Sequence, residues 1–175
     1  MKKYDLLRSG DNIIRVLEIQ GNRMLIVDCV KQSMPVWVVV STVEGYTTCA
    51  DEELREVTGI KVSPVDDLDA EQRKTMYDRY TMIAPILAVV SDEQLRSRMI
   101  CTVASSSGVC KRTIRNYLRL YLSYMDVAVL APKRREDDRA LTQDEKNIRW
   151  ALNKFFYTTK KQSDGLYNDA QREVL

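Results

Sequence analysis

The first third of the chain contains three runs of β-branched and aliphatic residues separated by polar turn residues. The runs cover residues 12–19, 23–30 and 36–41. Gln20, Gly21 and Asn22 supply turn chemistry between the first two runs, which predicts a β-hairpin. We expect Trp37, in the third run, to lie in the core, because a lone tryptophan among valines usually packs inside. The pattern predicts a small three-stranded antiparallel sheet, followed by a short helix over residues 51–57.

Helical spacing of apolar residues replaces the strand pattern after a linker at residues 61–68. Asp69 and Gln72 form a capping box, in which each side chain satisfies a free backbone N–H, so a helix should begin there. Pro85 falls inside this helix and predicts a kink or a restart near residues 83–84. The helix should pack on the segment that follows it, as one member of a small bundle.

Residues 91–124 predict a helix, a tight turn and a second helix. Ser91 and Gln94 form another capping box, so the first helix should cover residues 92–104. Gly108 follows, and glycine adopts the left-handed backbone of a sharp helix-to-helix turn without strain. The spacing of the last alanine of the first helix, this glycine and the apolar residues beyond it is typical of a helix-turn-helix motif.

The second helix is amphipathic, with an apolar stripe that starts at Val109 and ends at Leu122. Its opposite side is basic, and no acidic residue occurs between Leu95 and Met125. Arginine and asparagine hydrogen-bond guanine and adenine edges in the major groove of DNA. Basic helices are often only solvated surface helices, but the spacing, the missing acids and the asparagine among the arginines favour DNA binding. The candidate contacts to DNA are Lys111, Arg112, Arg115, Asn116 and Arg119, with Thr113 near a phosphate.

The uneven distribution of charge supports this interpretation. The whole chain of 175 residues carries a formal net charge of only +2. Residues 95–135, however, hold 9 basic and 1 acidic side chains, whereas residues 1–94 hold 11 and 16. A local excess of positive charge attracts polyanions whatever the total charge. The excess includes Lys133, Arg134 and Arg135, which either contact the DNA backbone or a minor groove, or form only a solvated linker.

The last part of the chain predicts a linker over residues 131–140 and a second helical domain over residues 141–175. Thr142 and Glu145 form a capping box, and apolar residues follow at helical spacing. Two amphipathic helices are too few to close an independent core, so we expect this domain to be incomplete and the natural protein to be longer. We expect the second domain to bind DNA as well.

The sequence lacks the residues that several classes of function require. The chain has no histidine, which excludes Ser-His and Cys-His catalytic pairs, and it has neither a P-loop nor a dinucleotide-binding glycine motif. The 4 cysteines are too scattered for a zinc site or a disulfide framework. The N-terminus lacks the apolar run of a signal peptide, and no segment is long enough to span a membrane. We expect a cytoplasmic protein with no membrane partner, no small-molecule cofactor, no metal and no catalytic residue in this segment.

Three short motifs from Arg79 onwards resemble those of a known family. A helix with RYxxI from Arg79 is followed by AxxxGVxKRTIxxYLxxY from Ala104 to Tyr121, and then by LTxDE from Leu141. These motifs resemble the N-terminal DNA-binding region of Mu-like DDE transposases, the family of the phage Mu and Tn7-like enzymes. The resemblance implies that the chain binds transposon ends through tandem helical domains. It also implies a downstream RNase H-like domain in which three carboxylates hold two Mg²⁺ ions.

Taken together, these patterns predict an α+β fold with a small β-rich module over residues 1–60 and a helix-turn-helix domain over residues 67–130. The function that they favour is sequence-specific binding of double-stranded DNA at transposon ends, with self-association on the DNA, by the N-terminal part of a transposase or integrase. Two alternatives stay open. One is a helix-turn-helix transcription regulator, and the other is a protein-interaction adaptor whose basic helix meets an acidic partner.

Overall fold

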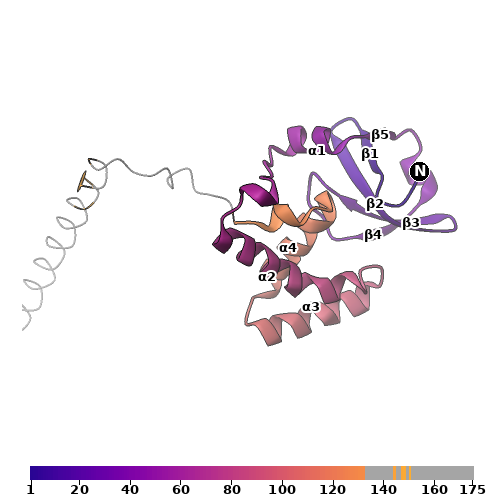
Figure 1. Cartoon of the computed structure of the whole chain (residues 1–175). Helices are drawn as coiled ribbons and strands as arrows, with labels where there is room; N and C mark the ends of the chain where they lie inside the picture. The colour runs from indigo at the N-terminus through magenta and orange to yellow at the C-terminus, as the bar shows by residue number, and fades with distance from the viewer. Residues whose placement is uncertain (133–143, 145–146, 149, 151–175) are drawn as a thin grey trace, which may run out of the picture. The chain divides into compact units, whose positions relative to one another are not determined.

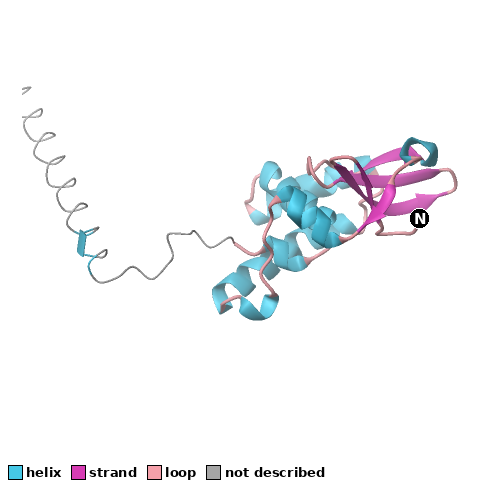
Figure 2. Ribbon diagram, turned by 90° about the horizontal axis from the view of Figure 1, so that it is seen from above, coloured by secondary structure: helices cyan, strands magenta, loops and turns pink. Residues whose placement is uncertain are grey.

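Five strands form one antiparallel sheet at the N-terminal end of the computed structural model (Figures 1 and 2). The strands predicted at residues 12–19, 23–30 and 36–41 are confirmed as β2, β3 and β4. The two further strands are too short and too poor in apolar residues for the pattern to indicate them. The order in the sheet is β4-β3-β2-β1-β5, so β4 and β5 are its edges. The strands are β1 (Leu6–Ser9), β2 (Asn12–Gln20), β3 (Arg23–Asp28), β4 (Val36–Val39) and β5 (Thr47–Cys49).

Both faces of the sheet bury apolar side chains, and β2 shows how. Ile13 and Leu17 belong to the main core on the helix side, whereas Ile14 and Val16 belong to a second cluster on the other face. This alternation follows from the two-residue period of a strand. A 3₁₀ turn, η1 (Val40–Val43), connects the two edge strands and contributes its buried last residue to the second cluster.

Four α-helices follow within residues 1–132, and the second of them begins at the cap that the sequence predicts. The predicted capping box is confirmed: the Asp69 N–H donates to the Gln72 side chain at 3.1 Å, and the Gln72 N–H donates to Asp69 at 2.8 Å. The predicted helix over residues 51–57 is also confirmed, and it ends at Gly59 with a φ of 64°. The helices are α1 (Asp51–Thr58), α2 (Ala70–Leu87), α3 (Glu93–Ser107) and α4 (Lys111–Tyr124), with 3₁₀ turns η2 (Val65–Asp67) and η3 (Val127–Leu130).

Two details of the helix predictions are wrong. Of the kink or restart predicted near residues 83–84, the restart does not occur, because α2 continues through Pro85 and ends at Leu87. Pro85 removes one backbone donor from the helix, but only two helical residues follow it. The N-cap of α3 is Asp92 and not Ser91, and the Asp92 carboxylate accepts from the Leu95 N–H at 2.8 Å. A carboxylate suits this position, since the helix dipole favours negative charge at an N-terminus.

One hydrophobic core joins the sheet to the helices. Its buried members include Leu25 of β3, Ile83 of α2, Ile100 of α3 and Leu118 of α4. In Figures 1 and 2 the strands occupy one end of this unit and helices α2 to α4 the other. The β-rich module and the helix-turn-helix segment therefore pack as one unit, Met1–Pro132.

The structure describes residues 1–132, 144, 147–148 and 150. The last four positions are helical and belong to a second unit that begins at Lys133. Most of the predicted linker over residues 131–140, with its three basic residues, and most of the predicted second domain lie outside the described residues. No helix in the described part of the chain is both long and apolar enough to cross a membrane.

Candidate nucleic-acid interface

The turn between α3 and α4 has the backbone that the sequence predicts. Gly108 ends α3 with a φ of 69°, and its N–H donates to the Ala104 carbonyl at 3.1 Å. Val109 packs half-buried against the main core, and Cys110 is the N-cap of α4 in an extended conformation. A connection this short holds α4 close against α3, as a helix-turn-helix motif requires.

Helix α4 divides into a buried side and an exposed side, as predicted. Ile114, Leu118 and Leu122 are buried, and Tyr121 is half-buried beside them. The helix thus contributes a continuous stripe to the core. Of the predicted DNA contacts, Lys111, Arg112 and Asn116 are exposed, while Thr113, Arg115 and Arg119 are partly exposed.

The two ends of α4 differ in accessibility. Its last residues, Ser123 and Tyr124, are buried because this end packs on β2 and β3. The hydroxyl groups of Tyr124 and Thr58, the last residue of α1, lie 2.5 Å apart. The first half of α4, where Lys111, Arg112 and Asn116 are exposed, is therefore its accessible end.

The cations on the exposed side of α4 pair with no carboxylate among the described residues. Four ion pairs occur in that part of the chain, and none involves a lysine or arginine of α4. The Arg119 guanidinium donates instead to the Arg115 carbonyl at 3.2 Å and to the side-chain oxygen of Asn116. These contacts order the side chains but leave their positive charge uncompensated.

Helix α2 holds α4 through aromatic contacts. The Arg79 guanidinium lies 5.1 Å from the centroid of the Tyr117 ring and donates to the Leu130 carbonyl at 2.7 Å. The rings of Tyr80 and Tyr121 are tilted with their centroids 5.4 Å apart. Burial, reinforced by the neighbouring Tyr80, raises the pKa of Tyr121 to about 12, so its hydroxyl stays protonated at neutral pH. Both α2 residues thus have structural contacts that fix the position of α4.

Arg15 of β2 joins the sheet to the end of α4, a contact that no local sequence pattern predicts. The side chain is only 4% exposed. It donates to the Ser123 carbonyl at 2.9 Å and to the Tyr4 carbonyl at 3.1 Å, and it pairs with Asp51 of α1. The last carbonyls of a helix lack partners within the helix and carry partial negative charge, so a cation there stabilises the helix end. Arg15 therefore anchors α4 on the sheet.

Arg96 has a corresponding role for α3. It is 5% exposed and donates to the Val90 carbonyl at 2.5 Å and to the Pro35 carbonyl at 3.1 Å. Burial lowers the pKa of Arg96 below its ordinary value. Nearby, the Trp37 indole donates to the Ser91 carbonyl at 2.9 Å while its ring packs half-buried against the main core. The segment before α3 is thus tied to β4 and the loop that precedes it.

The first turn of α4 contains an unusual cap. The Cys110 sulfur lies 3.1 Å from the Thr113 hydroxyl. Hydrogen bonding to Thr113, with smaller contributions from Arg112, lowers the pKa of the Cys110 thiol. The Thr113 hydroxyl, predicted to lie near a phosphate, is therefore at the helix N-terminus, where backbone N–H groups favour anions.

The basic residues counted between residues 95 and 135 fall into three groups. Arg96 is buried and serves the fold. Lys133, Arg134 and Arg135 lie outside the described residues. Arg98 is an exposed cation on α3, and the four remaining cations belong to α4.

No three cysteine, aspartate or glutamate side chains lie close enough to hold a metal ion in the part of the chain that the structure describes. The chain matches no protein-family model, and no curated protein resembles it significantly in sequence.

Proposed function

We propose that the chain binds double-stranded DNA sequence-specifically, with α4 in the major groove. The observation that supports this most is the exposed side of α4, which carries cations and an asparagine without a carboxylate partner among the described residues. Solvated surfaces normally intersperse both signs of charge. A helix that presents cations alone, after a short glycine turn, suits a polyanion with a groove wide enough for a helix.

The exposed residues of α4 divide into two roles under this proposal. Arg115 and Asn116, one turn into the helix, are the candidates for base contacts, because their side chains match guanine and adenine edges. Lys111, Arg112 and Thr113 lie in the first turn, where side chains and backbone N–H groups together hold a phosphate. When the protein binds DNA, the Asn116 side chain gives up its contact with Arg119 and hydrogen-bonds a base instead.

The DNA that we propose is a transposon end, recognised by the N-terminal part of a Mu-like transposase or integrase that self-associates on DNA. Support comes from the residues that carry the resemblance. Gly108 makes the α3–α4 turn, and Arg79 and Tyr80 hold α4 in place. Lys133, Arg134 and Arg135, which lie outside the described residues, are candidates for further contacts to the DNA backbone or a minor groove. This role places the protein in the cytoplasm and assigns Mg²⁺ chemistry to a separate catalytic domain.

Fluorescence anisotropy with labelled duplexes tests the proposal. The chain first selects duplexes from a random pool, and its affinity for a selected duplex is then compared with that for a scrambled one. We expect the selected duplex to bind about 10³-fold more tightly or better at physiological salt. Both affinities should fall steeply as salt rises, because phosphate contacts release counterions. Equal affinity for both duplexes, or no binding, would contradict sequence-specific recognition.

Single substitutions separate the two roles. Arg115→Ala should cost about 1–3 kcal/mol on the selected duplex and relax the preference at one base pair. Lys111→Ala should weaken binding to selected and scrambled duplexes alike, with a salt slope smaller by about 1. Lys31→Ala is the control, because this lysine is 81% exposed and lies in the loop between β3 and β4. An effect of Lys31→Ala equal to that of Lys111→Ala would mean that α4 is not the interface.

The same experiment distinguishes the two alternatives. An adaptor whose basic helix meets an acidic protein would show salt-sensitive binding to that protein and none to DNA. A transcription regulator would use α4 in the same way as a transposase, but its selected sequence would lie beside genes rather than at the ends of a mobile element.

A further inference from the structure

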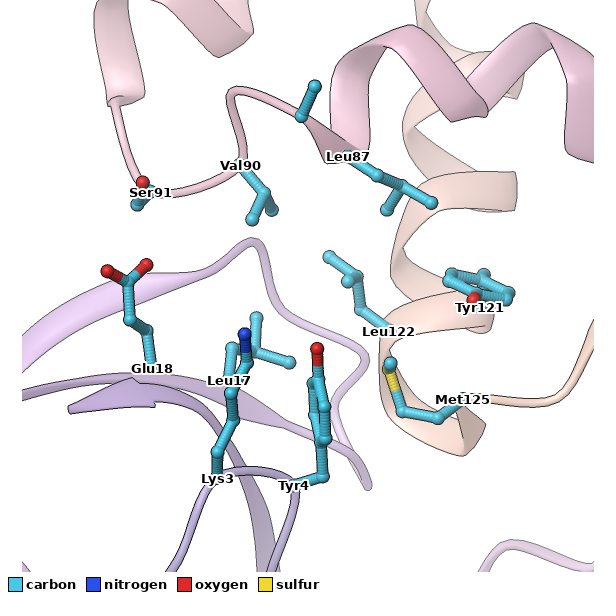
Figure 3. Close-up of a pocket in the computed structure, with 11 residues that line it drawn as sticks. Lys3, Tyr4, Leu17, Glu18, Leu87, Val90, Ser91, Tyr121, Leu122 and Met125 are labelled. Atoms are coloured by element: carbon cyan, nitrogen blue, oxygen red, sulfur yellow. The ribbon is translucent and has the colours of Figure 1, made fainter.

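A pocket of about 360 Å³ lies where the N-terminal segment, β2, the α2–α3 connection and the end of α4 meet (Figure 3). Its lining residues lie far apart in the sequence, from Lys3 to Met125. Sites for small molecules usually occupy about 300–1,000 Å³. The volume therefore suits a small metabolite rather than a large cofactor.

Two opposite charges face this pocket and do not pair with each other. Lys3 and Glu18 both line it, yet no ion pair in the described part of the chain involves either of them. The Lys3 ammonium lies 4.9 Å from the centroid of the Tyr4 ring, and the Glu18 carboxylate accepts from the Gln20 side chain at 2.6 Å. In Figure 3 the Lys3 ammonium lies beside Leu17, and the Glu18 carboxylate lies on the side of the pocket nearer to Ser91. A ligand that carries both charges finds a partner for each.

The remainder of the pocket provides apolar contacts. Leu17 and Leu122 are buried beneath it, and Leu87, Val90 and Met125 line it with partial exposure. In Figure 3 these side chains converge on the space between the sheet and the helices. An aliphatic or aromatic group placed there is removed from water on several sides, which is favourable in proportion to its apolar area.

The backbone at two points of the pocket wall is held in an unusual conformation. Tyr4 and Met125 have φ values of 73° and 51°, and the described residues contain only one other non-glycine residue with positive φ. The Tyr4 N–H donates to the Val16 carbonyl at 2.7 Å, and the Met125 N–H donates to the Tyr121 carbonyl at 2.6 Å. Met125 is the left-handed C-cap that ends α4. The positive φ of Tyr4, which costs about 1–3 kcal/mol, is maintained by its hydrogen bond to β2.

We infer that this pocket binds a free α-amino acid with an apolar side chain. The carboxylate of the ligand pairs with Lys3 and its ammonium group pairs with Glu18. The side chain of the ligand lies among Leu17, Val90 and Leu122. Because these residues belong to the sheet, the α2–α3 connection and α4, the ligand contacts three of the segments that pack around the end of the basic helix. The inference concerns a second site and does not depend on DNA binding.

Methyl NMR spectra of the full chain, titrated with amino acids, test the inference. L-leucine, L-methionine and L-phenylalanine are the probes, and two analogues of leucine each lack one charge: 4-methylpentanoate lacks the ammonium group, and 3-methylbutylamine lacks the carboxylate. We expect saturable shifts of the Leu17, Leu122 and Met125 methyl signals with at least one amino acid. Each analogue should bind roughly tenfold more weakly than leucine or worse, because it leaves one charged group without its partner. The absence of shifts with all three amino acids, or equal binding of the analogues, would overturn the inference.

Substitutions at the two charges make the test specific. Glu18→Gln should remove the advantage of leucine over 4-methylpentanoate, and Lys3→Gln its advantage over 3-methylbutylamine. Lys2→Gln is the matched control, since Lys2 is the neighbouring exposed lysine and does not line the pocket. None of the three side chains is buried, so all variants should keep the methyl spectrum of the folded chain. Unchanged amino-acid affinity in both Glu18→Gln and Lys3→Gln would overturn the inference, whatever the result with DNA.

Discussion

Arg15→Met tests how the position of α4 depends on a buried cation. Methionine keeps an unbranched apolar stem in place of the arginine but removes its charge and its donors. The buried Ser123 carbonyl then loses its partner at 2.9 Å and keeps only the weak Cys29 thiol donor at 3.6 Å. The Tyr4 carbonyl also loses its donor from Arg15, at 3.1 Å.

The expected magnitude follows from these contacts. A hydrogen bond to a charged group contributes about 1.5–3 kcal/mol, and two such bonds are lost. Asp51, the ionic partner of Arg15, has a side chain that is 50% exposed, so water solvates it again and its loss adds little. Removal of the cost of burying a guanidinium offsets part of the effect. The net loss should be about 2–4 kcal/mol, a large part of the roughly 5–15 kcal/mol that stabilises an ordinary domain.

Urea unfolding followed by circular dichroism measures this loss. Arg8→Met is the control, because the ion pair of Arg8 with Glu53 is solvent-exposed and such pairs contribute about 0–1 kcal/mol. Arg15→Met should also weaken the binding of selected DNA at temperatures where the chain is folded, since α4 loses its anchor. A destabilisation no larger than that of Arg8→Met would refute the claim that Arg15 fixes α4 on the sheet.

Three further outcomes follow from the structure. Gly108→Ala should lower the free energy of unfolding, measured in urea, by about 1 kcal/mol, because an added Cβ meets nothing within 4 Å and only the φ of 69° opposes it. Gly108→Asn should lower it by less, since asparagine tolerates a left-handed backbone better than alanine. A larger loss for asparagine than for alanine would contradict this explanation. Iodoacetamide should alkylate Cys110 before Cys29 and from a lower pH, since hydrogen bonding to Thr113 lowers the pKa of Cys110 whereas burial raises that of Cys29 to about 12. The free energy of unfolding should fall as pH rises from about 9 towards 12, because the unfolded chain then loses the Cys29 proton that the folded chain retains; a stability that rises over this range would refute the assignment.

The secondary structure could largely be predicted because its signals are local. Alternation in β2, the capping box of α2 and the glycine that ends α3 each lie within a few residues. Strands β1 and β5 could not be predicted in this way, since neither has the run of β-branched and aliphatic residues that indicates β4. Their pairing depends on register with distant strands, which the pattern along the chain does not contain.

The same distinction between local and tertiary signals applies to the residues of the candidate sites. Helical periodicity alone places Arg115 and Asn116 on the outer side of α4. The same reasoning fails for Arg15 and Arg96, because a charged residue within a strand or helix normally lies in solvent, and only tertiary packing reveals the carbonyl groups that these two bind. The pocket beside Glu18 could not be predicted from the sequence either, because four segments that are distant along the chain form it.

Chemical modification of the DNA tests the central claim, that α4 reads bases in the major groove, most directly. Guanine in a selected duplex is replaced, one position at a time, by 7-deazaguanine, which lacks the major-groove N7 acceptor. At one position the replacement should cost wild-type protein about 1–3 kcal/mol and cost Arg115→Ala almost nothing, because the contact is already lost. If no position weakens wild-type binding, or if the loss is the same in Arg115→Ala, Arg115 of α4 does not read a guanine from the major groove.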